Sequence, residues 1–147
     1  MESTARELAD AQECGVYQLA LAPEEVERAA KEAGLGIFRL DLGHAHNKKD
    51  FLAHVASALS FPDWFGNNWD ALKDCLEDLD WLPTKTGYVL VFERSEHFGT
   101  SHRQDFNIAT AVLAAAAEFW KTQGRPFWAF VAVSNGWDCG LPEWPKQ

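Results

Sequence analysis

A short segment of the chain concentrates the residue types that recognise or transfer charge. Residues 61–81, FPDWFGNNWDALKDCLEDLDW, place large aromatic side chains around a Gly-Asn-Asn sequence and follow them with a series of carboxylates. Asp70 and Asp74 are four positions apart, so on a helix their side chains are neighbours. Paired carboxylates suit either general acid–base catalysis or recognition of a basic surface. The segment therefore predicts an acidic site beside aromatic rings.

The local sequence predicts a helix that carries these carboxylates. Pro62 and Gly66 interrupt the chain before it, Asn67 is the predicted N-cap, and Asp70 would then take the third helical position, from which a carboxylate can reach back to the cap. The predicted buried stripe is Leu72, Cys75, Leu76 and Leu79, which makes Cys75 a buried, unpaired thiol. The predicted exposed face is Asp70, Lys73, Asp74, Glu77 and Asp78.

Trp69 lies at the edge of the buried stripe, next to the carboxylates. An exposed Trp beside charged residues is typical of the residues that dominate binding at protein interfaces. The alternative is a solvated acidic face with a half-buried Trp. The residue pattern alone leaves both interpretations open.

The remaining elements predict a single α/β domain that would hold this helix. Apolar runs at 15–21, 36–42, 87–93 and 126–133 are of strand length, and they alternate with predicted helices at 23–34, 51–60, 67–79 and 103–121. The runs at 87–93 and 126–133 are apolar on both faces, which predicts adjacent central strands of a mainly parallel sheet. The predicted apolar stripe of the last helix is Ile108, Val112, Ala115 and Phe119. Residues 1–13 lack a continuous stripe and predict a frayed helix.

Composition limits the partners that this domain can have. The 147-residue chain carries 22 acidic and 13 basic residues, a net charge of −9, which argues against direct nucleic-acid binding and favours a basic protein partner. Three scattered cysteines predict no disulfide framework. The chain begins without a signal-like segment and has no apolar run of membrane-spanning length. We therefore expect a monomeric cytoplasmic protein with no membrane contact and no cofactor.

The segment FPDWFGNNWDALKDCL resembles the motif of the barstar family of intracellular ribonuclease inhibitors. The resemblance implies a barstar-like parallel sheet packed with helices over residues 36–133, a strand–helix extension at 1–35 and a tail at 134–147. It implies an immunity protein or antitoxin that blocks a ribonuclease active site with its acidic helix. Asp74 would occupy the place of a substrate phosphate, Asp70 would bind basic residues beside it, and Trp64, Asn68 and Trp69 would line the interface.

Two departures from the family pattern bear on the partner. Lys73 stands where barstar has a tryptophan, and a Lys on the contact face opposes a basic pocket unless it turns outward or meets an acid. The acidic residue that barstar contributes from its last helix falls near Phe119, with Glu118 beside it. The predicted partner is therefore a relative of barnase or another basic toxin rather than barnase itself.

Two other functions are compatible with the sequence. One is an acidic adaptor of barstar fold with a partner that is not a ribonuclease. The other is a carboxylate- and His-dependent metal hydrolase, for which His44 and His46, near Asp41 and Asp50, are the candidate ligands. Two His residues in a polar loop are more often surface residues, and His97 and His102 lack the spacing of a helical zinc motif. The sequence therefore predicts a binding protein with no catalytic or metal-ligating residue.

Overall fold

Two apolar segments of the sequence lie side by side in the middle of a parallel sheet. In the computed structural model, which describes residues 2–133 and 136–145, these segments are β3 (Tyr88–Glu93) and β4 (Phe127–Ala132). They pair in parallel, with Val89 opposite Trp128 and Val91 opposite Phe130. Five of the six residues in each strand are buried, because helices cover both faces of the sheet. The prediction that the two runs are adjacent parallel strands is confirmed.

Three further strands complete the sheet. They are β1 (Val16–Leu19), β2 (Gly36–Asp41) and β5 (Glu143–Trp144). The spatial order is β2-β3-β4-β1-β5, and every neighbouring pair is parallel. The predicted α/β fold with a parallel sheet is confirmed. The sequence predicted four strands, and the fifth, β5, is a two-residue strand within the turn-rich tail.

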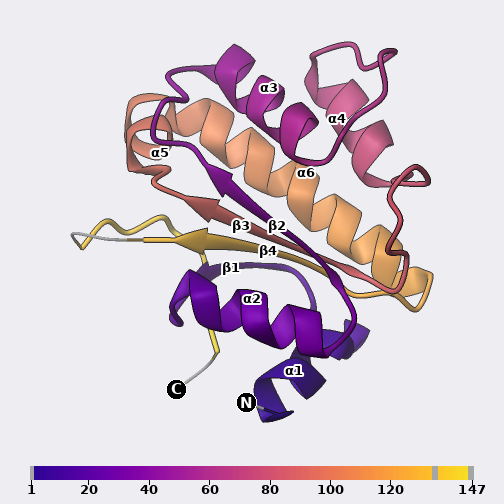
Figure 1. Cartoon of the computed structure of the whole chain (residues 1–147). Helices are drawn as coiled ribbons and strands as arrows, with labels where there is room; N and C mark the ends of the chain where they lie inside the picture. The colour runs from indigo at the N-terminus through magenta and orange to yellow at the C-terminus, as the bar shows by residue number, and fades with distance from the viewer. Residues whose placement is uncertain (1, 134–135, 146–147) are drawn as a thin grey trace.

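Helices form a layer on each face of the sheet (Figure 1). One layer contains α3, α5 and α6, with α4 packed on α6, and the opposite layer contains α1 and α2. Their bounds are α1 (Glu2–Ala9), α2 (Pro23–Glu32), α3 (Lys48–Ala58), α4 (Trp69–Leu76), α5 (Glu96–Ser101) and α6 (Arg103–Thr122), with a 3₁₀ helix, η1, at Ala11–Glu13. None of the helices in the described part of the chain is long and apolar enough to span a membrane.

Local sequence signals set the ends of two helices. Pro23 occupies the first turn of α2, where its missing N–H has no intrahelical partner to lose. Gly34 follows that helix with φ +75°, a conformation that costs Gly nothing. Asn47 caps α3, because its side chain accepts a hydrogen bond from the Asp50 N–H at 2.9 Å. The sequence predicted the start of α2 at Pro23, but it placed the start of α3 at residue 51, three residues after the observed start at Lys48.

The N-terminal helix is packed rather than frayed. Leu8 of α1 is fully buried, and its carbonyl accepts a hydrogen bond from the Trp128 indole N–H at 2.8 Å. This bond joins α1 to β4 across 120 positions of sequence. The prediction of a frayed helix was wrong because the contact depends on one apolar residue and one carbonyl, which leave no periodic signal.

The buried stripe of α6 is rotated from the predicted one. Its buried residues are Phe106, Ala109, Leu113, Ala116, Ala117 and Trp120. Ile108, from the predicted stripe, is 38% exposed, and Ala115 is also exposed. The sequence is apolar around most of this helix, so periodicity alone does not determine which side packs on the sheet.

Candidate functional site

An aromatic cluster supports the loop between α3 and α4. The rings of Phe61 and Phe65 meet edge to face at 4.9 Å between centroids, and Phe61 meets Trp81 at 5.9 Å. Trp81 is held in turn by a 2.8 Å hydrogen bond from its indole N–H to the Leu59 carbonyl. Trp64 lies against the edge of this cluster, 6.4 Å from Trp81, and is 60% exposed. The loop therefore presents Trp64 to solvent from a packed base, in which Trp81 was not predicted.

Asn68, not Asn67, caps α4. The Asn68 Oδ1 accepts from the Ala71 N–H at 2.7 Å, and its Nδ2 donates to the Gly66 carbonyl at 3.3 Å. Asn67 has φ +54° and belongs to the turn before the helix. Asp70 consequently occupies the second helical position, and the predicted reach back to the cap is wrong. Both Asn residues are good caps by type, and the left-handed turn at Asn67 selects the second one.

The far end of α4 is fixed to α6. The helix ends at Leu76, three residues before the predicted end, and the Leu76 carbonyl accepts a hydrogen bond from the buried Trp120 indole N–H at 2.7 Å. Leu79 then turns the chain with φ +52°. Asp78 therefore lies in a turn, where its Oδ1 accepts from the Asp80 N–H at 3.3 Å, rather than on the helical face. The predicted buried stripe is confirmed, since all four of its residues are fully buried: Leu72, Cys75, Leu76 and Leu79.

Two carboxylates remain on the exposed face of α4. Asp70 and Asp74 are exposed, and no ion pair or hydrogen bond within the described part of the chain involves either carboxylate. Lys73 lies between them in sequence, but its Nζ pairs with the Glu77 Oε1 at 3.1 Å. This pair offsets the positive charge of Lys73 within one turn of the helix. The solvent face of α4 therefore carries two uncompensated negative charges.

Trp69 is half-buried at the base of this face. Its ring lies 6.1 Å from Phe51 of α3, and the Lys48 ammonium lies 5.3 Å from the ring centroid. A cation over an aromatic face stabilises the contact by roughly 0.5–1 kcal/mol at an exposed site. Trp69 thus joins α4 to α3, and Lys48 was not predicted from the sequence.

Glu118 has a local partner on α6. Its carboxylate pairs with Lys121 at 3.2 Å and is otherwise well exposed. Burial raises the pKa of the Cys14 thiol, and the negative charge of Glu118 adds to this rise. Glu118 is therefore close enough to interact electrostatically with the segment before β1. Among the described residues, no hydrogen bond or ion pair joins Glu118 to α4.

The histidines considered as metal ligands separate into a loop residue and a small ring cluster. His46 meets His97 edge to face at 5.4 Å, and His97 meets His102 at 6.5 Å, whereas His44 is an exposed loop residue. Across residues 2–133 and 136–145, no three or more His, Cys, Asp or Glu side chains converge closely enough to hold a metal ion. The described residues therefore provide no cluster for the metal-hydrolase alternative.

A comparison with protein-family models matches residues 35–132 to the family described as barstar (barnase inhibitor). A search of curated proteins finds no match. Two solved structures of the Aeropyrum pernix ORC2 protein, one of ADPNP–ADP complexes and one of the ADP form, are similar in fold. Their TM-scores are 0.56 and 0.58 at 13% and 15% identity, over 90% and 92% of this chain. The chain spans 40% of the length of each ORC2 chain, and at such identities the likeness concerns the fold alone.

Proposed function

Because this chain belongs to the barstar (barnase inhibitor) family, we propose that it inhibits a ribonuclease or a related basic toxin by inserting α4 and the preceding loop into the active site. Membership in this family supports a general role as an inhibitor, because the family is that of the barnase inhibitor. The contact residues are our assignment: Asp70 and Asp74 at the centre, with Trp64, Asn68 and Trp69 beside them and Lys73, Glu77 and Asp78 at the edge.

The observation that carries this proposal is the pair of uncompensated carboxylates on a helix fixed at both ends. Asn68 caps the start of α4 and Trp120 binds the carbonyl at its end, so Asp70 and Asp74 are presented in one geometry. A ribonuclease needs cations around the phosphates of its substrate, and rigidly held carboxylates can take the place of those phosphates. Pre-organisation lowers the entropy that binding must overcome.

The charge of the whole chain supports the same kind of partner. A net charge of −9 attracts a basic enzyme and speeds the encounter, while the local pairs decide the bound orientation. The Lys73–Glu77 pair reduces the repulsion that a free lysine would exert on a basic active site. Trp64, largely exposed on its aromatic base, adds an apolar contact of the type that dominates interfaces.

The test combines capture of the partner with an activity assay. The purified protein is used to capture partners from its native cells, and each captured protein is assayed for RNA cleavage with and without the protein. We expect Asp74→Ala to weaken binding to the captured ribonuclease by at least about 100-fold, because the cations that surround Asp74 in the complex would be left buried without a counter-charge.

Asp80→Ala is the matched control, since Asp80 is also exposed but lies after the end of α4. Glu77 is unsuitable as a control because its removal would free Lys73. Asp74→Ala should keep or slightly raise stability, by about 0.2–0.5 kcal/mol, because it removes repulsion with Asp70. Unchanged affinity of Asp74→Ala, or a captured partner that does not cleave RNA, would contradict the proposed function, and the second result would favour the adaptor.

A further inference from the structure

One side of α6 is apolar and is left uncovered by the rest of the described chain. Ile108, Val112, Ala115 and Phe119 recur at helical spacing, so they lie along one face of the helix. Ile108 is 38% exposed, Ala115 is also exposed, and Val112 and Phe119 are half-buried. We call these four residues the exposed stripe of α6. A helix that is apolar on two sides is typical of one that packs against two surfaces, and the described chain covers only one side.

The exposed stripe borders the contact between α6 and α4. α4 packs on α6, and the Trp120 indole N–H binds the Leu76 carbonyl at the end of α4. Ala116 lies one turn before Trp120 and is fully buried, so both residues belong to the packed side of α6. Val112 and Phe119 are neighbours of Ala116 on the helix surface, four residues before it and three residues after it. The exposed stripe therefore begins where the contact with α4 ends.

α4 is too short to form a stable interface alone. Its eight residues span about 12 Å. Stable protein interfaces engage roughly 20–30 residues on each partner. A partner that binds Asp70 and Asp74 must therefore also contact the surface beside α4.

Charge distinguishes the two flanks of α4. On one flank, α3 begins with Lys48 and Lys49, which repel a basic partner. Lys48 lies close to α4, because its ammonium is 5.3 Å from the centroid of the Trp69 ring. On the other flank, residues 106–117 of α6 contain no charged side chain. A basic protein bound to α4 is therefore favoured on the side of α6, where its contact also removes apolar surface from water.

We propose that the exposed stripe of α6 extends the partner-binding surface of α4 and contacts an apolar patch beside the cations of a basic protein partner. This inference rests on the proposed function for the contact at Asp70 and Asp74. Trp64 and Ile108 are the large apolar side chains most exposed in the described chain, and they lie on the loop before α4 and on α6. A second copy of the chain fits the stripe poorly, because each copy carries a net charge of −9 and an acidic α4 beside the stripe.

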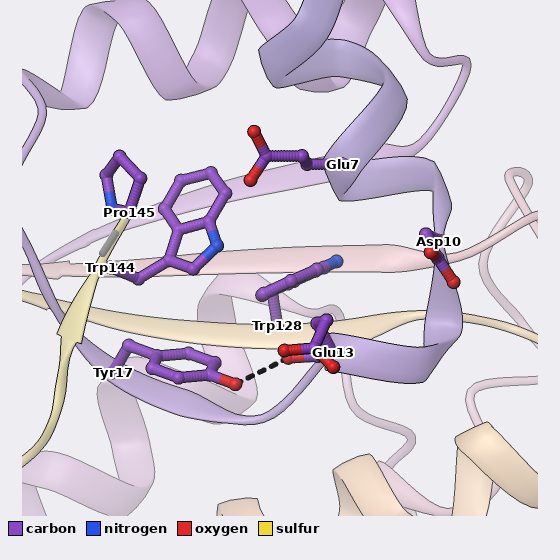
Figure 2. Close-up of a pocket in the computed structure, with 7 residues that line it drawn as sticks. All are labelled: Glu7, Asp10, Glu13, Tyr17, Trp128, Trp144 and Pro145. Atoms are coloured by element: carbon purple, nitrogen blue, oxygen red, sulfur yellow. Dashed lines mark hydrogen bonds between the residues drawn. The ribbon is translucent and has the colours of Figure 1, made fainter. Parts of the chain in front are cut away.

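A second acidic surface offers a basic protein another place to dock. On the opposite face of the sheet, Glu7, Asp10 and Glu13 line a pocket of about 210 Å³ beside Tyr17 and Trp144 (Figure 2). α4 and α6 lie on the other side of the sheet (Figure 1). Contact with this pocket and contact with the exposed stripe are therefore separate outcomes, and the test includes variants of both surfaces.

The first measurement asks whether the loop before α4 and the exposed stripe touch the same protein. A photoreactive diazirine amino acid replaces Ile108 in one version of the full chain and Trp64 in another. Each version is illuminated in an extract of the native cells, and the crosslinked proteins are identified by mass spectrometry. We expect both positions to crosslink to the same basic protein.

The second measurement compares the affinities of variants for that purified protein by calorimetry. Ala115→Arg should weaken binding by at least about 100-fold, because it places a bulky cation between the stripe and a basic surface. Ala114→Arg is the matched control, since Ala114 is also exposed and receives the same charge but lies off the stripe. This control and Glu7→Gln/Glu13→Gln should stay within about threefold of the unaltered chain. Ile108→Ala should weaken binding by roughly tenfold at both low and high salt, because an apolar contact is not screened.

Circular dichroism reports whether each variant is folded. A crosslink from position 108 to a second copy or to a protein that position 64 does not reach, or no crosslink from position 108, would overturn the proposal. Equal affinities of folded Ala115→Arg and Ala114→Arg would also overturn it, as would a loss of binding in Glu7→Gln/Glu13→Gln alone. The proposed function fails separately: if the shared partner does not cleave RNA, the common surface of α4 and α6 is still supported.

Discussion

The Cys75 thiol and the Asp74 carboxylate are neighbours in sequence but have opposite environments. Asp74 is exposed on α4, whereas Cys75 is fully buried and unpaired. Burial raises the pKa of the Cys75 thiol to about 11, and the charges of Asp78 and Asp74 add to the rise. The negative charges of Asp78 and Asp74 thus help to raise the pKa of a thiol on the buried side of the same segment.

The first prediction at the scale of residues concerns this thiol. We expect Cys75 to react with a thiol reagent far more slowly in the native chain than in denaturant, because it is both buried and protonated. Peptide mapping by mass spectrometry separates Cys75 from Cys14 and Cys139, which are also buried. Similar rates for Cys75 in the two states would contradict its burial.

The raised pKa also gives a dependence of stability on pH. The pKa of Cys75 is higher in the folded chain than the ordinary value of 9.0, so the unfolded chain loses the proton first as pH rises. The stability associated with the protonated thiol is complete below pH 9 and is lost between about pH 9 and 11. Denaturant midpoints of the unaltered chain and Cys75→Ala over this range measure the effect, and parallel curves would contradict it.

At the scale of elements, the two ends of α4 are specified in different ways. Its start is set by a turn in which Asn67 takes a left-handed conformation and Asn68 caps the helix. Its end is set by the long-range bond from Trp120 to the Leu76 carbonyl, across 44 positions. A local cap leaves a signal in the sequence, whereas a bond between distant elements does not.

A matched pair of variants tests the cap. Asn68→Ala should lower the free energy of unfolding by about 1 kcal/mol, because the Ala71 N–H loses its side-chain acceptor. Asn67→Gly should leave stability nearly unchanged, since Gly adopts the left-handed conformation without strain. Urea denaturation of both variants measures the difference. A larger loss for Asn67→Gly than for Asn68→Ala would show that the cap is assigned to the wrong residue.

The same contrast explains how much of the structure the sequence could predict. The apolar runs of β3 and β4, Pro23, and the buried stripe through Cys75 are local patterns, and each predicted its element correctly. Periodicity failed at α6, where Ala-rich sequence is apolar on most sides, and at α1, where one residue, Leu8, provides the packing. For the candidate site, residue type and spacing predicted that Asp70 and Asp74 lie exposed on one helix, which the structure has, while their role in binding stays a prediction. The sequence did not predict the partner of Lys73, because a salt bridge at i, i+4 is one of several rotamer choices.

At the scale of the whole molecule, the N-terminal segment is part of the sheet. β1 lies between β4 and β5 and pairs with β4 through four registered positions, from Val16–Ala129 to Leu19–Ala132. α1 and α2 cover the face of the sheet opposite α6 (Figure 1), and Val26, Ala29 and Ala30 of α2 are buried. Residues 1–35 therefore contribute part of the hydrophobic core, although the segment that matches the family begins only at residue 35.

This arrangement predicts the result of a truncation. A chain of residues 36–147 would expose one face of the sheet and turn β4, with the sequence FWAFVA, into an unpaired edge. An exposed, apolar edge strand pairs readily with other chains. We expect this shortened chain to aggregate or to remain unfolded, and the addition of a peptide of residues 1–35 to restore soluble, folded protein. Size-exclusion chromatography and circular dichroism of the shortened chain, with and without the peptide, measure both effects. A folded monomer of residues 36–147 with the stability of the full chain would show instead that residues 1–35 are a separate extension.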